Sequence, residues 1–163
     1  MLIILITIVI LLLGVSSALV YNLINETNNE NTKKSINNPI EDKTIEEAIE
    51  NFNETYINYL LIEMDADELK RTPVSREKPI IDMEIEDEKY HAIIDRREIE
   101  VEEGSNEKSD IKIITTREEI VKIMFDEEYL VESFSSGNSQ IELLSSERTL
   151  FLKGYLKIYN KFN

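Results

Sequence analysis

The stretch SDIKIITTREEIVKIM, residues 109–124, changes its periodicity half-way along. In its first half Ile111 and Ile113 alternate with polar residues, which is typical of a half-buried strand. The sequence TREE at 116–119 then has the form of a capping box, which starts helices. The apolar spacing beyond it is helical, carried by Ile120, Ile123 and Met124. The pattern therefore predicts a strand that runs directly into a helix.

Strand-like segments flank this unit on both sides. Before it, residues 81–86 alternate apolar and acidic side chains, and KYHAIID (89–95) and REIEVE (97–102) predict two more strands. The short polar loops between them favour an antiparallel meander with one face packed on the core and the other exposed to solvent. After it, SQIELL (139–144) predicts a fifth strand, with Ile141 and Leu143 facing the core.

The predicted helices have recognisable starts and stops. A capping box, TIEE at 44–47, opens a helix whose apolar stripe continues to Leu60. DEEYLVESFSSG (126–137) predicts a short helix stopped by glycine, and ERTLFLKGYLKIYNKF (147–162) a C-terminal one. The sequence thus predicts an α+β fold, a five-stranded mostly antiparallel sheet with helices covering one face.

The N-terminus has the composition of a transmembrane helix. Residues 2–21 read LIILITIVILLLGVSSALVY, in which fourteen of twenty residues are Leu, Ile or Val and none is charged. About twenty apolar residues span a bilayer core. A cleaved signal peptide is the alternative, but the basic n-region is missing and the apolar run is long. We expect a transmembrane anchor at 1–24, a flexible Asn-rich linker at 25–43 and a soluble domain at 44–163.

The orientation of the anchor follows from nearby lysines. Lys33 and Lys34 lie close enough after the span for the positive-inside rule to apply. The expectation is a single-pass membrane protein whose soluble domain is cytoplasmic.

Charge and composition exclude several classes of function. The net charge is -15, from 33 acidic and 18 basic residues, which disfavours nucleic acid as a partner. There is no cysteine and only one histidine, His91. Thiolate metal sites, a Cys nucleophile and a three-histidine zinc site are therefore excluded. No metal and no cofactor are predicted.

Catalytic motifs are weak. The acidic runs at 86–88 and 126–128 fit solvated strand ends and helix starts better than a pair of catalytic carboxylates. An enzyme would have to use His91 with a neighbouring acid such as Asp95. A rim or surface role for His91 is the simpler interpretation, so a non-catalytic module is expected.

The remaining candidate site is an apolar slot between the sheet and its helices. Such slots are ordinary ligand sites, although a filled core uses the same residue types. We predict lining by Met83, Ile85, Ile113, Ile120, Met124, Leu130, Phe134, Phe151 and Tyr155.

The order of these elements resembles the sterol carrier protein family of lipid-binding domains over residues 44–162. The family's strand-to-helix motif is matched by Asp110, Ile113, Thr115, Glu118 and Glu119. Its C-terminal motif is matched by Phe151, Leu152, Gly154, Leu156, Lys157 and Ile158. The resemblance implies a non-catalytic binder of fatty acyl chains or other lipids, with Ile113, Ile120 and Met124 along the wall of an apolar tunnel.

Two functions therefore follow as expectations. The first is binding of a lipid or fatty acyl ligand by a domain that the N-terminal helix holds at the membrane. The alternative is an anchored acidic scaffold, without a pocket, whose glutamate-rich sheet face binds a basic protein partner.

Overall fold

The computed structural model describes residues 37–159. Its elements, in chain order, are α2 (Ile45–Glu50), α3 (Glu54–Glu63), the 3-10 turn η1 (Ala66–Glu68), β1 (Ile80–Ile85), β2 (Glu88–Asp95), β3 (Glu98–Glu103), β4 (Ile111–Thr115), α4 (Arg117–Phe125), α5 (Tyr129–Ser135), β5 (Gln140–Leu143), α6 (Glu147–Lys153) and α7 (Tyr155–Tyr159). All five predicted strands are present, and the α+β class is confirmed.

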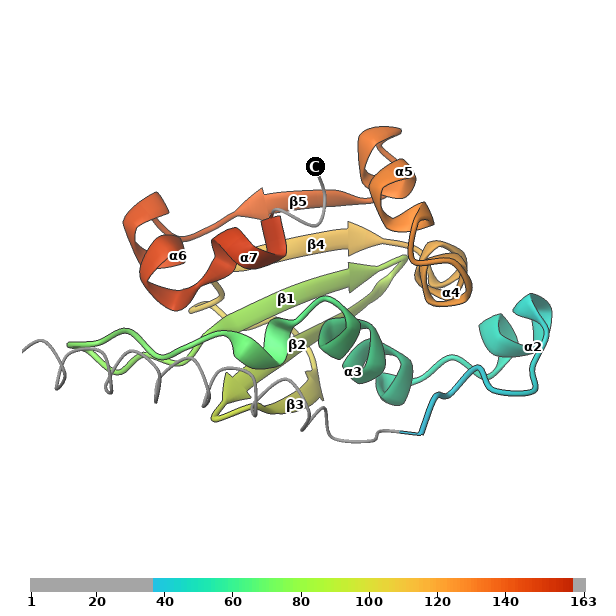
Figure 1. Ribbon diagram of the computed structural model, residues 1–163, viewed down its shortest axis with the longest axis horizontal. Helices are drawn as coiled ribbons and strands as arrows, with labels where there is room; N and C mark the ends of the chain where they lie inside the picture. The colour runs from blue at the N-terminus through green and yellow to red at the C-terminus, as the bar shows by residue number, and fades with distance from the viewer. Residues whose placement is uncertain (1–36, 160–163) are drawn as a thin grey trace, which may run out of the picture. The chain divides into compact units, whose positions relative to one another are not determined.

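The strands form one mixed sheet in the order β3-β2-β1-β4-β5 (Figure 1). Three of its four pairings are antiparallel, and β1 pairs with β4 in parallel. In the meander β1-β2-β3, β1 pairs with β2 along one edge only. After the loop that begins at residue 104, β4 pairs with the other edge of β1. The sheet is therefore mostly antiparallel, as predicted, with its parallel pair at the centre.

The predicted switch from strand to helix lies at Thr116. The Thr116 side chain accepts a hydrogen bond from the Glu119 N–H at 3.2 Å, which starts α4 directly after β4. Only this half of the predicted capping box forms, because the Glu119 carboxylate turns into the domain instead of back to Thr116. The box at Thr44 and Glu47 forms in both directions.

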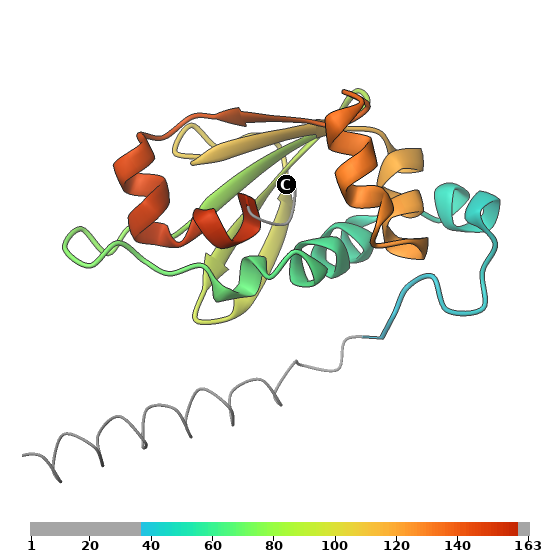
Figure 2. The same cartoon turned by 45° about the horizontal axis from the view of Figure 1, so that its top comes forward.

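One face of the sheet is apolar and packs against the helices, which gather on one side of it (Figure 2). Ile81, Met83 and Ile85 of β1 are at most 1% exposed on this face. They lie in register with Ala92, Tyr90 and Glu88 of β2. Because side chains alternate between the two faces of a sheet, Ala92 and Tyr90 lie on the same face and extend the core onto β2. The helix-facing residues of α3 and α4 complete the same core.

Two predicted helices are broken into shorter ones. The helix expected from Thr44 to Leu60 stops at Glu50, and α3 restarts at Glu54 because the Asn53 side chain accepts the Thr55 N–H at 2.9 Å. The helix expected over 147–162 is α6 and α7, separated by Gly154 with φ of 92°. Asparagine and glycine here act as a cap and a left-handed stop.

The residues just before α2 also pack on the domain. Ile40 is 7% exposed and clusters with Ala48, Tyr56 and Val121. The end of the linker expected at 25–43 therefore belongs to the domain's packed structure. Within residues 37–159 no helix has the length and apolarity to cross a bilayer. The anchor expected at 1–24, and most of the linker, lie outside the described residues.

Candidate functional site

The predicted slot between α4, α5 and the sheet is nearly filled. Ile113, Ile120, Leu130 and Phe134 do meet there, but around a cavity of only about 10 Å³. This is about the space that one water molecule requires. Met83 and Ile85 are core residues at 1% and 0% exposure. This part of the site could not accept an acyl chain without opening.

Met124 and Leu130 line a second hollow, which lies between α3, α4 and the start of α5. Its volume is about 230 Å³, and its lining includes Glu63 and Glu127. This hollow is small and carries two carboxylates, which makes it a poor site for an apolar ligand.

A larger apolar hollow lies instead between the sheet edge and helices α6 and α7. It has a volume of about 640 Å³ and is lined by Ile111, Ile141, Leu143, Glu147, Arg148, Leu150, Phe151, Tyr155, Leu156, Ile158 and Tyr159. Nine of these eleven residues are apolar or aromatic. We call this hollow the C-terminal groove. Of the nine residues predicted from the sequence, it contains Phe151 and Tyr155.

Several large apolar side chains of this groove are exposed, while others at its base are buried. Phe151 is 64% exposed, Leu143 59% and Leu156 52%. Contiguous exposed apolar surface of this kind marks interaction or ligand sites in soluble domains. Within residues 37–159, the groove thus combines a hollow with several exposed large apolar side chains.

Local sequence places the groove's walls. The edge strand β5 pairs with β4 alone, Ile141 opposite Ile113 and Leu143 opposite Ile111, so its far side is open. Ser146 caps α6, accepting from the Thr149 N–H at 3.3 Å. Gly154 then ends α6 in the left-handed conformation, and α7 adds the residues that form the second wall.

A buried ionic cluster fixes α6 and α7 beneath the groove. The Lys153 ammonium donates to both Asp110 carboxylate oxygens, at 2.7 and 2.9 Å, and to the Lys78 carbonyl at 2.9 Å. Tyr155 and Ser145 hydroxyls also donate to Asp110, at 3.0 and 2.9 Å. Burial, together with the Asp110 carboxylate, raises the pKa of Tyr155 well above its usual value.

Local sequence patterns do not predict this cluster. Asp110 belongs to the motif that resembles the sterol carrier protein family, and Lys153 belongs to no motif. Two signals could have pointed to this pair. Asp110 is an acid directly before a buried strand, and Lys153 is a lysine inside an apolar helical stripe. Neither pattern is specific, because each is common on protein surfaces.

A second buried polar network joins α4 to α5 and β5. Glu119 accepts from the Ser133 hydroxyl at 2.7 Å and from the Tyr129 hydroxyl at 3.1 Å. Ser133, Ser139 and Thr115 continue the chain of hydroxyl contacts at 2.8 and 2.7 Å. Burial raises the pKa of Glu119, but the hydrogen bonds from Ser133 and Tyr129 and the nearby Lys122 outweigh it, so that the pKa is lowered.

His91 and Asp95 have separate partners. The His91 ring lies 3.0 Å from the Gly104 carbonyl through Nδ1 and 3.4 Å from a Glu102 oxygen through Nε2. Asp95 instead accepts two hydrogen bonds from Arg71, at 2.9 and 2.6 Å. The contacts of His91 join β2 to β3 and the residue after it, and those of Asp95 join β2 to the loop after η1, so the two side chains do not form one acid–base pair.

Comparison with known proteins gives distant similarities. No protein-family model matches the chain, and no curated protein matches it. Among solved structures it is similar to a double mutant of the sec-alkyl sulfatase PisA1, with a TM-score of 0.46 and 14% identity over 71% of this chain and 17% of that one. It is also similar to the UbiJ-SCP2 ubiquinone synthesis protein, with a TM-score of 0.40 and 12% identity over 66% of this chain and 92% of that one. The chain therefore spans about a sixth of the sulfatase, and neither similarity is close enough to assign an activity.

Proposed function

We propose that this protein binds a fatty acyl chain or a similar apolar ligand, without catalysis, in the C-terminal groove. The observation that carries the proposal is the exposure of the groove's large apolar side chains, above all Phe151 at 64% and Leu143 at 59%. A volume of about 640 Å³ lies in the range of small-molecule sites. The site proposed here is therefore displaced from the slot expected between α4, α5 and the sheet.

The energetics favour an elongated ligand. Each methylene that leaves water contributes roughly 0.8 kcal/mol, so that ten carbons contribute about 8 kcal/mol before the cost of immobilisation. Arg148 lies on the rim of the groove and has no ion pair among residues 37–159. Its guanidinium can pair with the carboxylate of a fatty acid.

The proposal includes the membrane anchor expected at residues 1–24. An apolar ligand is dissolved in the bilayer, and a single-pass anchor keeps the domain beside that source. The lysines at 33 and 34 favour a cytoplasmic domain.

A photoreactive fatty acid tests this function on the full chain in membrane vesicles. Illumination should attach the diazirine probe to residues of β5, α6 and α7, which peptide mass spectrometry would locate. Phe151→Ser should lower labelling at least fivefold. The matched control is Leu152→Ser, because Leu152 lies next to it on α6, is 40% exposed and is not part of the groove lining.

The test compares the labelling of Phe151→Ser with that of Leu152→Ser. If both label as the wild type does, or if the probe is attached elsewhere in the domain, the groove is not the ligand site.

A second candidate function is the acidic scaffold. The sheet face opposite the helices carries Glu84, Glu100, Glu102 and Glu142, among which Lys112 pairs with Glu84 and Glu142 at 3.8 and 2.9 Å. A basic protein partner could bind this face. Salt-sensitive capture of such a partner by vesicles that take up no fatty acid would favour it.

A further inference from the structure

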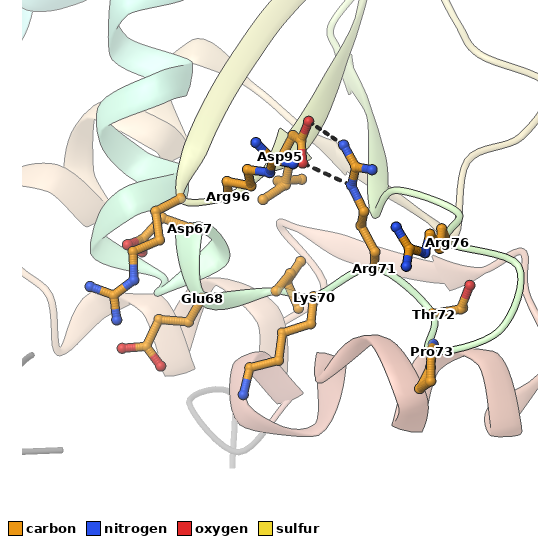
Figure 3. A pocket seen from close by; sticks show the side chains of 12 residues that line it. Asp67, Glu68, Lys70, Arg71, Thr72, Pro73, Arg76, Asp95 and Arg96 are labelled. Carbon is orange, nitrogen blue, oxygen red and sulfur yellow. Dashed lines mark hydrogen bonds and ion pairs between the residues drawn. The ribbon is translucent and has the colours of Figure 1, made fainter. Parts of the chain in front are cut away.

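A basic cavity stands out in this acidic chain (Figure 3). It has a volume of about 490 Å³ and lies between the loop that follows η1 and the turn that joins β2 to β3. Its charged lining is Asp67, Glu68, Lys70, Arg71, Arg76, Asp95, Arg96 and Arg97. Five of the eight are cations, although acids outnumber bases 33 to 18 in the whole chain.

Two of the three acids of this cavity, Asp95 and Glu68, are matched by cations. Asp95 accepts from Arg71 at 2.6 Å and lies 3.3 Å from the Lys78 ammonium, and Figure 3 shows the paired guanidinium of Arg71 facing it. Glu68 pairs with Lys157 of α7. Burial, with Glu68 beside it, raises the pKa of Asp67, while Arg97 opposes that rise.

Three cations remain without a carboxylate partner. Lys70, Arg76 and Arg96 form neither an ion pair nor a side-chain hydrogen bond within residues 37–159, and each is exposed to solvent at the cavity. The three cations come from two separate segments of the chain. Within the loop that carries Arg76, the Thr72 carbonyl accepts from the Arg76 N–H at 3.1 Å and closes a turn.

The backbone holds these arginines in a conformation that arginine rarely adopts. Arg76, Arg96 and Arg97 have φ of 54°, 53° and 70°. Arg96 and Arg97 are the two central residues of the turn, since Asp95 pairs with Glu98. Two-residue turns with both φ positive strongly prefer Asn-Gly. Strained residues of this kind cluster at functional sites.

We propose that this cavity binds a phosphate group. Guanidinium groups match phosphate oxygens in bidentate geometry and stay charged at every physiological pH. Arg76, Arg96 and Lys70 line this cavity from two separate segments and are the cations left to pair with a phosphate, while Arg71 stays engaged by Asp95. This inference does not depend on the proposed fatty-acyl site.

Two sources could supply the phosphate, a soluble phosphate ester or a phospholipid headgroup. Helix α7 borders both regions, since Lys157 pairs with the cavity's Glu68 while Leu156 and Ile158 line the C-terminal groove. A phospholipid could therefore engage the two together, but a soluble ester would need the cavity alone.

The test uses the full chain in phosphatidylcholine nanodiscs. Binding is followed by the shift of the domain's thermal unfolding midpoint. One arm titrates inorganic phosphate against chloride at matched ionic strength, and the other replaces a fifth of the lipid by phosphatidic acid. Stabilisation by both inorganic phosphate and phosphatidic acid indicates a general phosphate site. Stabilisation by phosphatidic acid alone indicates a headgroup site.

The decisive variant is Arg96→Asn with Arg97→Gly. It installs the residues that the turn prefers, so the unliganded domain should melt at the same or a higher temperature. Its apparent affinity for the stabilising probe should fall at least tenfold. The control is Lys89→Gln with Lys108→Gln, which removes the same charge from two exposed lysines that do not line the cavity.

Retained affinity in the turn variant would overturn the proposal. An equal loss in the lysine control would also overturn it, because net charge would then explain the effect. The same holds if neither phosphate nor phosphatidic acid stabilises the wild type. Uptake of the photoreactive fatty acid is measured in the same samples, so that failure of this site and failure of the groove are told apart.

Discussion

The ammonium of Lys153 lies 2.7 Å from Oδ1 of Asp110, and the two side chains are 3% and 1% exposed. The contact joins the last residue of α6 to the residue before β4, 43 positions earlier in the chain. Backbone groups add to it, since the Ile80 N–H donates to the same carboxylate at 2.9 Å. The pair therefore holds the groove-forming helices against the centre of the sheet.

Lys153→Met is expected to lower the free energy of unfolding by about 3–5 kcal/mol. The substitution leaves a buried carboxylate with hydrogen-bond donors but without a counter-charge, and single deletions from buried pairs have this cost. Chemical denaturation at pH 7 measures it. The matched control is Lys157→Met on α7, whose 56% exposed ammonium pairs with Glu68 and contributes roughly 0–1 kcal/mol.

Adding Asp110→Asn to Lys153→Met should recover part of that loss, because the uncompensated charge is then removed. A double variant that is less stable than Lys153→Met alone would contradict a buried-charge origin of the effect.

Glu119→Gln is expected to make stability less dependent on pH. The pKa of Glu119 is lowered in the folded state, so the unfolded state binds more protons and folding is favoured as the pH rises. Its contribution is present above the unfolded value, about 4.5, and is lost as the pH falls through the folded pKa. At pH 7 the variant should lose about 1–2 kcal/mol, from hydrogen bonds to a charged group.

Unfolding curves at pH 7 and pH 3 test this expectation. The difference between wild type and Glu119→Gln should shrink at the lower pH. Glu118→Gln, whose 59% exposed carboxylate pairs with Lys122 across one helical turn, should change stability by less than about 0.5 kcal/mol. An equal effect of the two variants would contradict a special role for the buried carboxylate.

Phe134→Trp separates the predicted slot from the C-terminal groove. The cavity beside Phe134 is about 10 Å³, so a larger ring must displace its neighbours at a cost of about 1–3 kcal/mol. Labelling by the photoreactive fatty acid should persist below the lowered melting temperature. Loss of labelling in a folded Phe134→Trp domain would instead place the ligand between α4, α5 and the sheet.

Local patterns sufficed for most of the fold. Apolar segments between short polar joints located all five strands, most of them with a period of two, and the threonine caps located the starts of α2 and α4. The breaks at Asn53 and Gly154 were missed because the apolar spacing continues through them. The hydrogen bond from Ser133 to Glu119 was missed as well. The local sequence TREE is the same whether the glutamate caps its own helix or accepts from a distant residue.

The candidate sites depend on tertiary packing that no pattern encodes. Phe134 and Phe151 occupy similar positions on amphipathic helices, yet one is packed against the core and the other is 64% exposed. The difference arises because β5 is an edge strand with an open far side. The basic cavity combines Arg76 with Arg96, and strand pairing, not sequence proximity, brings their segments together.

Gly154→Ala is expected to destabilise the domain and to weaken the groove. A Cβ at this position would meet Leu69 at 3.9 Å, which is an ordinary contact, so the strain comes from φ of 92° and not from a clash. Left-handed backbone costs a residue with a Cβ roughly 1–2 kcal/mol. If α7 relieves this strain by shifting, the wall formed by Tyr155 and Ile158 moves with it.

Gly137→Ala supplies the matched comparison, because Gly137 has φ of 84° and a Cβ there would contact nothing within 4 Å. Both variants should lose similar stability in denaturation. Only Gly154→Ala should also reduce photolabelling by the fatty acid, since Gly137 follows α5 and contributes nothing to the groove lining. Equal labelling in the two variants would mean that α7 is held by the Asp110 cluster alone, with Gly154 serving only to end α6.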